Sequence, residues 1–185
     1  MILANRTQSH LLVIDVQERL APAIADVKQT VTNIDRLIRY ATTLGVPVTL
    51  TEHMPARIGH LLPELIACAG PAALVIEKQA FSAVREPTFA SRIRDLEQSN
   101  RPLAIVCGME AHVCVMQTVL ELIASGHQVM LVADAVGSRT AQNRDLAINR
   151  MAAAGATIVS QEMVAFEWLE RGDAPEFKDI LKVLK

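Results

Sequence analysis

The chain has 185 residues, of which 51% are hydrophobic and 21% charged, and its formal net charge at pH 7 is -2. This composition excludes a disordered chain and predicts a sizeable hydrophobic core. The charge balance predicts no nucleic-acid partner and no anionic membrane surface as a partner. At roughly 150 residues per domain, the length predicts one domain over residues 1–185. No apolar run reaches the roughly 18 residues of a transmembrane helix, so no membrane span is expected.

The cysteines are Cys68, Cys107 and Cys114. Three thiols do not close a disulfide framework, and polar residues between positions 5 and 10 interrupt any apolar core of a signal peptide. We therefore expect a cytoplasmic protein in which the thiols act individually.

Short apolar runs alternate along the chain with longer amphipathic segments. The runs that we expect to form strands span 10–15, 46–50, 73–76, 103–106, 129–132 and 157–159. Helices are expected over 31–44, from 86 onward, over 113–124 and over 143–154, and one or two more in a helical tail at 162–185. Strands that are apolar on both faces and are separated by helices indicate the α/β class, with a doubly wound, mainly parallel sheet and right-handed crossovers.

Three reactive residue types follow the predicted strands. Asp15 ends the first strand, Lys78 ends the third, and Cys114 lies shortly after the fourth. Because ligands of open α/β sheets bind beyond the carboxyl ends of the strands, we expect a site at this edge. Asp15 and Lys78 fit two hypotheses, a pair that takes part in catalysis and a buried ion pair with a structural role alone.

Cys114 stands where the helix that runs to residue 124 is expected to begin. The N–H groups and the dipole of a helix N-terminus stabilise a thiolate, which is the nucleophilic form of cysteine. The alternative is a small buried hydrophobic residue, and we expect that role for Cys68 and Cys107. His10 and His127 begin strands and are expected at the surface.

Several common site motifs are absent from the sequence. The glycine-rich patterns G-x-G-x-x-G and G-x-x-x-x-G-K-[ST], which cradle phosphates, do not occur, and neither does the G-x-S-x-G turn of serine hydrolases. His53 and His60 lie with Glu52 in an irregular loop over 52–63, but their spacing matches no zinc signature. We therefore predict no metal and no cofactor.

With these residues placed, the chain resembles the isochorismatase-like cysteine hydrolase superfamily, which includes nicotinamidases and carbamoyl amidases. The likeness spans residues 8–165 and is carried by the segments 12–17 (LVIDVQ), 77–82 (EKQAFS) and 108–118 (GMEAHVCVMQT). The segment 51–55 (TEHMP) is similar to the loop of the metal-free, broadly uncharacterised branch. There Thr51 stands in place of the aspartate of the nicotinamidase metal site.

The resemblance implies a three-layer α/β/α fold with a six-stranded, mainly parallel sheet in the order 3-2-1-4-5-6. It implies a catalytic triad of Asp15, Lys78 and Cys114. It also implies a cis peptide between Met109 and Glu110, which directs the N–H of Glu110 beside the N–H of Cys114 to form an oxyanion hole. Finally, it implies a homo-oligomer.

The sequence and the resemblance together predict a hydrolase that cleaves a C–N bond of a small carboxamide through a thioester at Cys114. Family members that hydrolyse the vinyl ether of isochorismate lack this thiol, so that reaction is not expected. The alternative is a catalytically silent member of the family that acts as an oligomeric interaction protein or as a thiol sensor.

Candidate contacts to the small-molecule substrate are mostly apolar, which favours an uncharged substrate: Gln17, Leu20, Met54, Phe81, His112 and Val115. For Gln17, a role in capping the first strand is an equal alternative. The apolar residues of the tail are expected to offer a surface for self-association: Val164, Phe166, Trp168 and Leu169.

Overall fold

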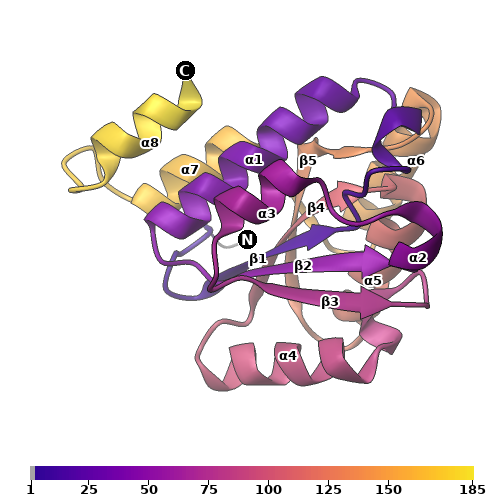
Figure 1. Ribbon diagram of the computed structural model, residues 1–185. Coiled ribbons are helices and arrows are strands. Elements are labelled where there is room, and N and C mark those ends of the chain that lie inside the picture. The colour runs from indigo at the N-terminus through magenta and orange to yellow at the C-terminus, as the bar shows by residue number, and fades with distance from the viewer. Residues whose placement is uncertain (1–2) are drawn as a thin grey trace.

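The computed structural model describes residues 3–185, and over this range six strands form one parallel sheet (Figure 1). The strands are β1 (Ser9–Ile14), β2 (Val48–His53), β3 (Leu74–Lys78), β4 (Leu103–Met109), β5 (Gln128–Gly137) and β6 (Thr157–Val159). Their order is β3-β2-β1-β4-β5-β6, with parallel pairing throughout. The predicted order and parallel sheet are therefore confirmed.

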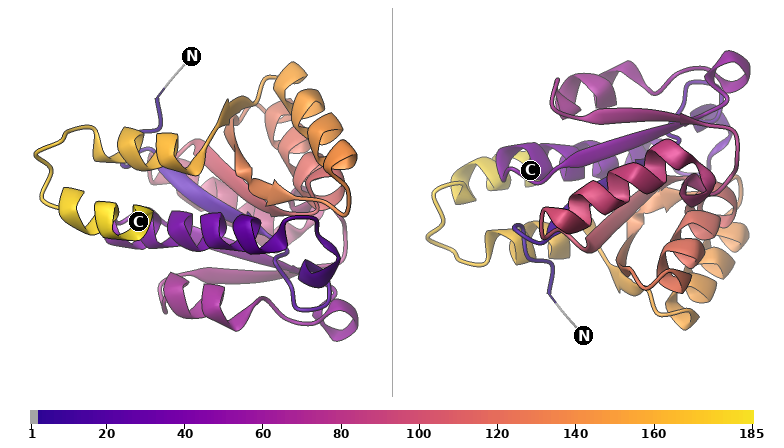
Figure 2. Two further views of the ribbon diagram at one scale, coloured as in Figure 1. Left: turned by 90° about the horizontal axis from the view of Figure 1, so that it is seen from above. Right: turned by 90° about the horizontal axis from the view of Figure 1, so that it is seen from below.

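Helices cover both faces of the sheet (Figure 2). The helices are α1 (Val27–Thr43), α2 (Pro55–Ile58), α3 (Pro63–Ala69), α4 (Pro87–Gln98), α5 (Met116–Ala124), α6 (Ala141–Ala153), α7 (Gln161–Leu169) and α8 (Phe177–Leu184). Side chains of α1, α3, α7 and α8 share one hydrophobic core, and those of α4, α5 and α6 share the other. No helix within residues 3–185 has the length and apolar character needed to cross a membrane.

The central strand β1 shows why the sheet is buried on both faces. All six of its residues are buried, and its side chains alternate between the two cores. Leu11 and Val13 pack on the side of α1, whereas Leu12 and Ile14 pack on the side of α4 and α5. This alternation follows from the two-residue period of a strand, and it leaves Asp15 directly beyond the buried end of β1.

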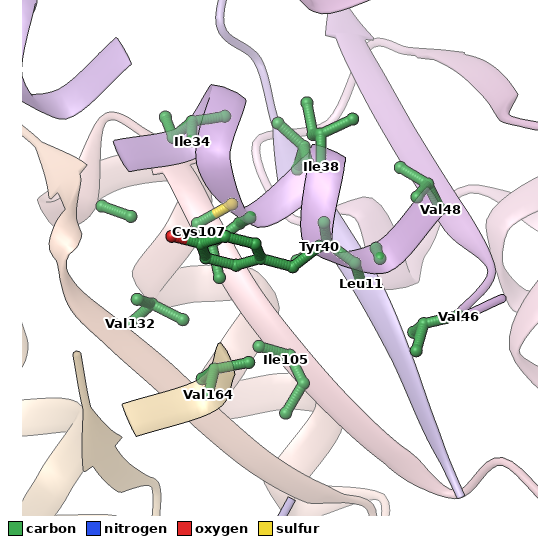
Figure 3. Packing of buried hydrophobic residues seen from close by; sticks show 14 of the residues in the cluster. Leu11, Ile34, Ile38, Tyr40, Val46, Val48, Ile105, Cys107, Val132 and Val164 are labelled. Atoms are coloured by element: carbon green, nitrogen blue, oxygen red, sulfur yellow. The ribbon is translucent and has the colours of Figure 1, made fainter. Parts of the chain in front are cut away.

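The core on the side of α1 is built from aliphatic residues and two more polarisable groups. Figure 3 shows Cys107 of β4 and Tyr40 of α1 among Ile34, Ile105 and Val132. Cys107 is fully buried, as expected for a small hydrophobic residue, and burial raises the pKa of its thiol. Cys68 is half-buried in the last turn of α3, where its thiol donates to the carbonyl of Leu65.

Two expectations about surfaces are wrong. In the tail, Val164, Trp168 and Leu169 are buried within the chain because they face α1 and β5, and of the four apolar residues only Phe166 is exposed. His10 is 3% exposed, because the start of β1 lies between β2 and β4 in the middle of the sheet.

Candidate active site

The backbone bends sharply at the carboxyl end of β1, where Asp15 begins the candidate site. Asp15 has φ 49°, in the left-handed region, and its N–H donates to the carbonyl of Thr51 at 3.2 Å. The neighbouring strand β4 approaches closely at Gly108, which pairs with Ile14 and has φ 125°. A Cβ at Gly108 would collide with the backbone of Ile14, so the approach requires glycine.

A buried ion pair joins Asp15 to Lys78. The ammonium Nζ lies 2.7 Å from Oδ2 of Asp15, and both side chains are completely buried. The hydroxyl of Thr51 donates to the second carboxylate oxygen, Oδ1, at 2.6 Å. One oxygen of this carboxylate therefore accepts a hydrogen bond and the other lies in an ion pair, and together these contacts fix its orientation at the edge of the sheet.

The segment after β3 supplies the remaining partners of the Lys78 ammonium. Nζ donates to the carbonyls of Ala80 at 3.1 Å and Phe81 at 2.9 Å. This turn is held in place by Glu86, whose Oε1 accepts the N–H groups of Gln79 and Ala80. Two hydrogen bonds and the ion pair with Asp15 hold the ammonium in one position.

Cys114 lies in a π-helical turn (Ala111–Val115) that precedes α5, and 5% of its surface is exposed. The carbonyl of Glu110 accepts the N–H groups of Val113 and Val115, but not the N–H of Cys114 between them. Helix α5 begins at Met116, two residues after Cys114, so Cys114 lies before this helix and not at its start as the sequence predicted.

The electrostatic environment of Cys114 differs from the expectation of a stabilised thiolate. Burial, together with the Asp15 carboxylate, raises the pKa of Cys114 to about 12, and the Lys78 ammonium opposes this shift. Desolvation and the neighbouring negative charge of Asp15 thus outweigh the positive charge of Lys78. The thiol interacts with both members of the ion pair and carries its proton at neutral pH.

The turn that carries Cys114 is held by contacts to the segment after β5. The peptide bond between Met109 and Glu110 is cis, as the resemblance implied. The buried carboxylate of Glu110 pairs with Nε of the exposed Arg139 at 2.9 Å. His112 lies 3.0 Å through Nδ1 from the hydroxyl of Ser138.

The other candidate substrate contacts occupy different environments. The Phe81 side chain is 50% exposed, and its ring centroid lies 5.3 Å from that of His53. Met54 lines a cavity of about 630 Å³ that also reaches Lys78, whereas Leu20 packs partly against the core on the side of α1. Phe81 thus has a half-exposed ring near His53, while its carbonyl contacts Lys78.

Two proposed substrate contacts point elsewhere. The Gln17 amide donates to the carbonyls of His53 and Gly59 and accepts the N–H of His53, so no N–H of this amide remains for a substrate. Val115 is completely buried and packs in the core on the side of α5. Gln17 therefore holds the loop after β2, and Val115 contributes to the core.

The histidines of this loop have separate partners. Glu52 accepts the N–H of Leu61 at 2.7 Å and lies 3.2 Å from Nδ1 of His60. Burial and the Lys78 ammonium lower the pKa of His53. Among the residues that the structure describes, no three His, Cys, Asp or Glu side chains are grouped to hold a metal ion.

Thr51 is a site residue that sequence reasoning missed as a hydrogen-bond donor. The register of the sheet pairs Thr51 with Ile14, the residue before Asp15. A hydroxyl at that position on the neighbouring strand lies within reach of the carboxylate that follows. Aligning the first two strands in parallel register would have predicted this contact from the sequence.

The fold and the site geometry define a three-layer α/β protein with a buried Asp–Lys pair and a cysteine at the carboxyl edge of its sheet. The chain belongs to the isochorismatase family, whose domain matches residues 9–163. It is 34% identical to isochorismatase domain-containing protein 2 of Rattus norvegicus over 96% of this chain and 81% of that protein.

Two solved structures are also similar. A structure described as MAR1 ribonuclease from Caenorhabditis elegans has a TM-score of 0.92 and 32% identity, over 99% of this chain and 92% of that chain. YcaC from Pseudomonas aeruginosa, described with hexane-2,5-diol and covalent acrylamide, has a TM-score of 0.89 and 25% identity, over 98% and 91%. These likenesses extend over nearly the whole of this chain.

Proposed function

We propose that this chain is a cysteine hydrolase that cleaves the C–N bond of a small carboxamide through a thioester at Cys114. The observation that carries the proposal is the completely buried Asp15–Lys78 pair, whose two charges both act on the Cys114 thiol. An acid–base group beside a nucleophile is the arrangement that covalent hydrolysis requires.

In the acylation half, Asp15 accepts the thiol proton of Cys114 as the sulfur attacks the carbonyl carbon. The C–S bond forms and the carbonyl electrons move to the oxygen, which accepts N–H bonds from Glu110 and Cys114. Collapse of this oxyanion breaks the C–N bond, and the leaving nitrogen takes its proton from Asp15. The products are an acyl-thioester at Cys114 and ammonia or an amine.

In the second half, Asp15 removes a proton from a water molecule that attacks the thioester carbonyl. The C–S bond breaks, the carboxylic acid leaves, and the sulfur recovers its proton from Asp15. The three groups exchange one proton, so they titrate as a coupled set. Lys78 favours the thiolate at Cys114 and keeps the carboxylate oriented through its contact with Oδ2.

The resting state of the thiol helps to choose between the functions. Oxidation sensors rely on an accessible thiolate, whereas Cys114 has a pKa of about 12 and 5% exposure. This favours a thiol that is activated by its base during a reaction. The covalent acrylamide described for the Pseudomonas aeruginosa protein supports a reactive nucleophile in this family, since thiols add to the C=C bond of acrylamide.

The proposal also covers partners and location. A net charge of -2 supports a small-molecule substrate rather than RNA, despite the ribonuclease description of the Caenorhabditis elegans neighbour. The exposed side chains of Met163 and Phe166 on α7 support self-association as a homo-oligomer. The free state of all three cysteines supports a cytoplasmic location.

The test measures ammonia release from a panel of small carboxamides, with nicotinamide included. Cys114→Ala is expected to abolish release while the circular dichroism spectrum stays unchanged. Cys68→Ala is the matched control, because it removes a half-buried thiol on α3 and is expected to retain full activity. Release that persists in Cys114→Ala would refute the thioester step.

If no amide is turned over, the rate at which acrylamide labels Cys114 in the intact protein decides the matter. Rapid labelling that saturates with acrylamide concentration would show that the Cys114 site is reactive and that the panel lacks its substrate. An inert thiol would refute the proposal and favour the catalytically silent alternative.

A further inference from the structure

Thr118 lies on the first turn of α5 and is completely buried. Its hydroxyl donates to the carbonyl of Cys114 at 2.7 Å, one helical turn earlier. The same oxygen accepts the N–H of Ala83 at 3.0 Å, from the segment that follows β3. One hydroxyl therefore connects two parts of the chain that are 35 residues apart.

The first of these bonds alone would be ordinary. Serine and threonine in helices commonly donate to the carbonyl four residues earlier. The second bond is not local, and it uses a lone pair of the oxygen while the proton is committed to Cys114. Together the two bonds define a single orientation of the hydroxyl between the helix and the segment after β3.

That segment is the one that fixes the ammonium of Lys78. Nζ donates to the carbonyl of Phe81, two residues before Ala83. A short path therefore runs from Lys78 through Phe81 to Ala83, and then across the Thr118 hydroxyl to the backbone of Cys114. Thr118 joins the segment that holds the cation to the turn that holds the thiol.

We infer that Thr118 is a positioning residue that sets the distance between the Cys114 sulfur and the Asp15–Lys78 pair. The inference rests on the proposed function for its effect on turnover. A thiol with a raised pKa is activated only while its sulfur stays within reach of the carboxylate, so a small displacement slows the covalent step. Misplacements of about 1 Å cost roughly 100-fold in enzymes that depend on such alignment.

The test compares Thr118→Val, which has nearly the same shape but no hydroxyl, with Thr118→Ser, which keeps the hydroxyl. Thr118→Val is expected to lower kcat by about 10- to 100-fold with KM changed less than about threefold. Thr118→Ser is expected to restore kcat to within about threefold of the parent protein. The matched control is Thr49→Val, another buried threonine, whose hydroxyl accepts from Arg92 away from the site.

A second variant removes the other end of the connection. Ala83 is the first residue of a 3-10 turn (Ala83–Arg85), and Ser82 before it is extended, with φ -73° and ψ 126°. The backbone at this position accommodates proline, so Ala83→Pro removes the N–H that Thr118 accepts, and its ring Cδ takes the place of the amide hydrogen and displaces the Thr118 hydroxyl from Ala83. Ala83→Pro is expected to slow the reaction of Cys114 in the same direction as Thr118→Val, including where Thr118→Val does not fold.

A readout that is independent of turnover separates this inference from the proposed function. The second-order rate of Cys114 labelling by acrylamide is expected to fall about 10-fold in Thr118→Val and in Ala83→Pro, but not in Thr118→Ser or Thr49→Val. This order would support the inference even if no carboxamide were hydrolysed. Labelling and kcat at the parent rate in folded Thr118→Val, or losses equal to those of Thr49→Val, would overturn it.

Discussion

The hydroxyl of Thr51 lies 2.6 Å from Oδ1 of Asp15, on the opposite oxygen of the carboxylate from the Lys78 ammonium. The donor Thr51 belongs to β2, which pairs with β1, and Asp15 directly follows β1. The orientation of the proposed base therefore depends on the register between β1 and β2.

Thr51→Val removes this donor while it keeps the branched shape of the side chain. We expect the free energy of unfolding to fall by about 1 kcal/mol, since a buried carboxylate oxygen loses its partner. The kcat for carboxamide hydrolysis is expected to fall about 10-fold, because the carboxylate is free to rotate. Thr51→Ser should recover most of both losses, and equal losses in Thr51→Ser and Thr51→Val would show that the methyl group matters instead.

The thiol of Cys114 is expected to titrate far into the alkaline range. With Cys68 and Cys107 replaced by alanine, the ultraviolet absorbance of a thiolate should not rise below about pH 10, because burial and Asp15 raise the pKa to about 12. The folded pKa lies above the ordinary value of 9.0, so the folded state retains its proton more strongly. The associated stability is present below pH 9 and is lost as the pH rises toward 12.

A titration of Cys114 centred near pH 8 would contradict this prediction. It would show a resting thiolate and would remove the need for Asp15 as the base. Further replacement of Cys114 by alanine supplies the baseline, because that protein has no thiol left to titrate.

His10 should make the protein sensitive to acid. Burial, reinforced by the charge of Arg92, lowers the pKa of His10 to about 3. As the pH falls below about 6.5, His10 therefore binds a proton in the unfolded chain but stays neutral in the folded chain. The contribution of His10 is complete above pH 6.5 and is lost as the pH falls toward 3, with a slope of up to about 1.4 kcal/mol per pH unit.

Denaturant titrations between pH 7 and pH 4 test this slope. His10→Phe has no titrating group and should give a flatter dependence of the unfolding free energy on pH. Ser9→Ala, a change at the adjacent buried residue, should lower stability equally at each pH and leave the slope intact. A parent-like slope in His10→Phe would assign the acid sensitivity to other groups.

The Gln17 amide should stabilise the loop after β2. Gln17→Leu removes three hydrogen bonds to His53 and Gly59, and we expect a loss of about 2–3 kcal/mol in the free energy of unfolding. Hydrogen exchange should accelerate over residues 53–60 more than in β4. If Gln17 instead served the substrate, the variant would raise KM without a change in exchange.

Much of the fold was accessible from the sequence because the central strands are apolar on both faces. The first strand was placed to within a residue, since β1 has six consecutive buried residues. The second was placed too early, at 46–50, because its end contains the polar residues Thr51 and Glu52. Those side chains are buried by their bonds to Asp15 and Leu61, which are contacts that a single sequence does not display.

The residues that meet at the site were predictable because strand ends in a parallel sheet share one edge. The directions of nearby side chains were not, since they depend on turns rather than on periodicity. Gln17 and Val115 illustrate this point: each lies within three residues of a site candidate, yet one bonds to a loop and the other packs in a core. The protonation of Cys114 also depends on burial, which is a property of the folded chain.

The cation of the site belongs to the outermost strand on its side of the sheet. β3 pairs with β2 alone, and Leu74 and Val75 at its start are about 40% exposed. Strands at a sheet border detach at lower cost than central ones, so warming should release Lys78 from Asp15 while the other five strands stay together. Heating should therefore abolish the proposed hydrolase activity several degrees below the temperature at which the core unfolds. Cooling should then restore that activity without refolding of the core.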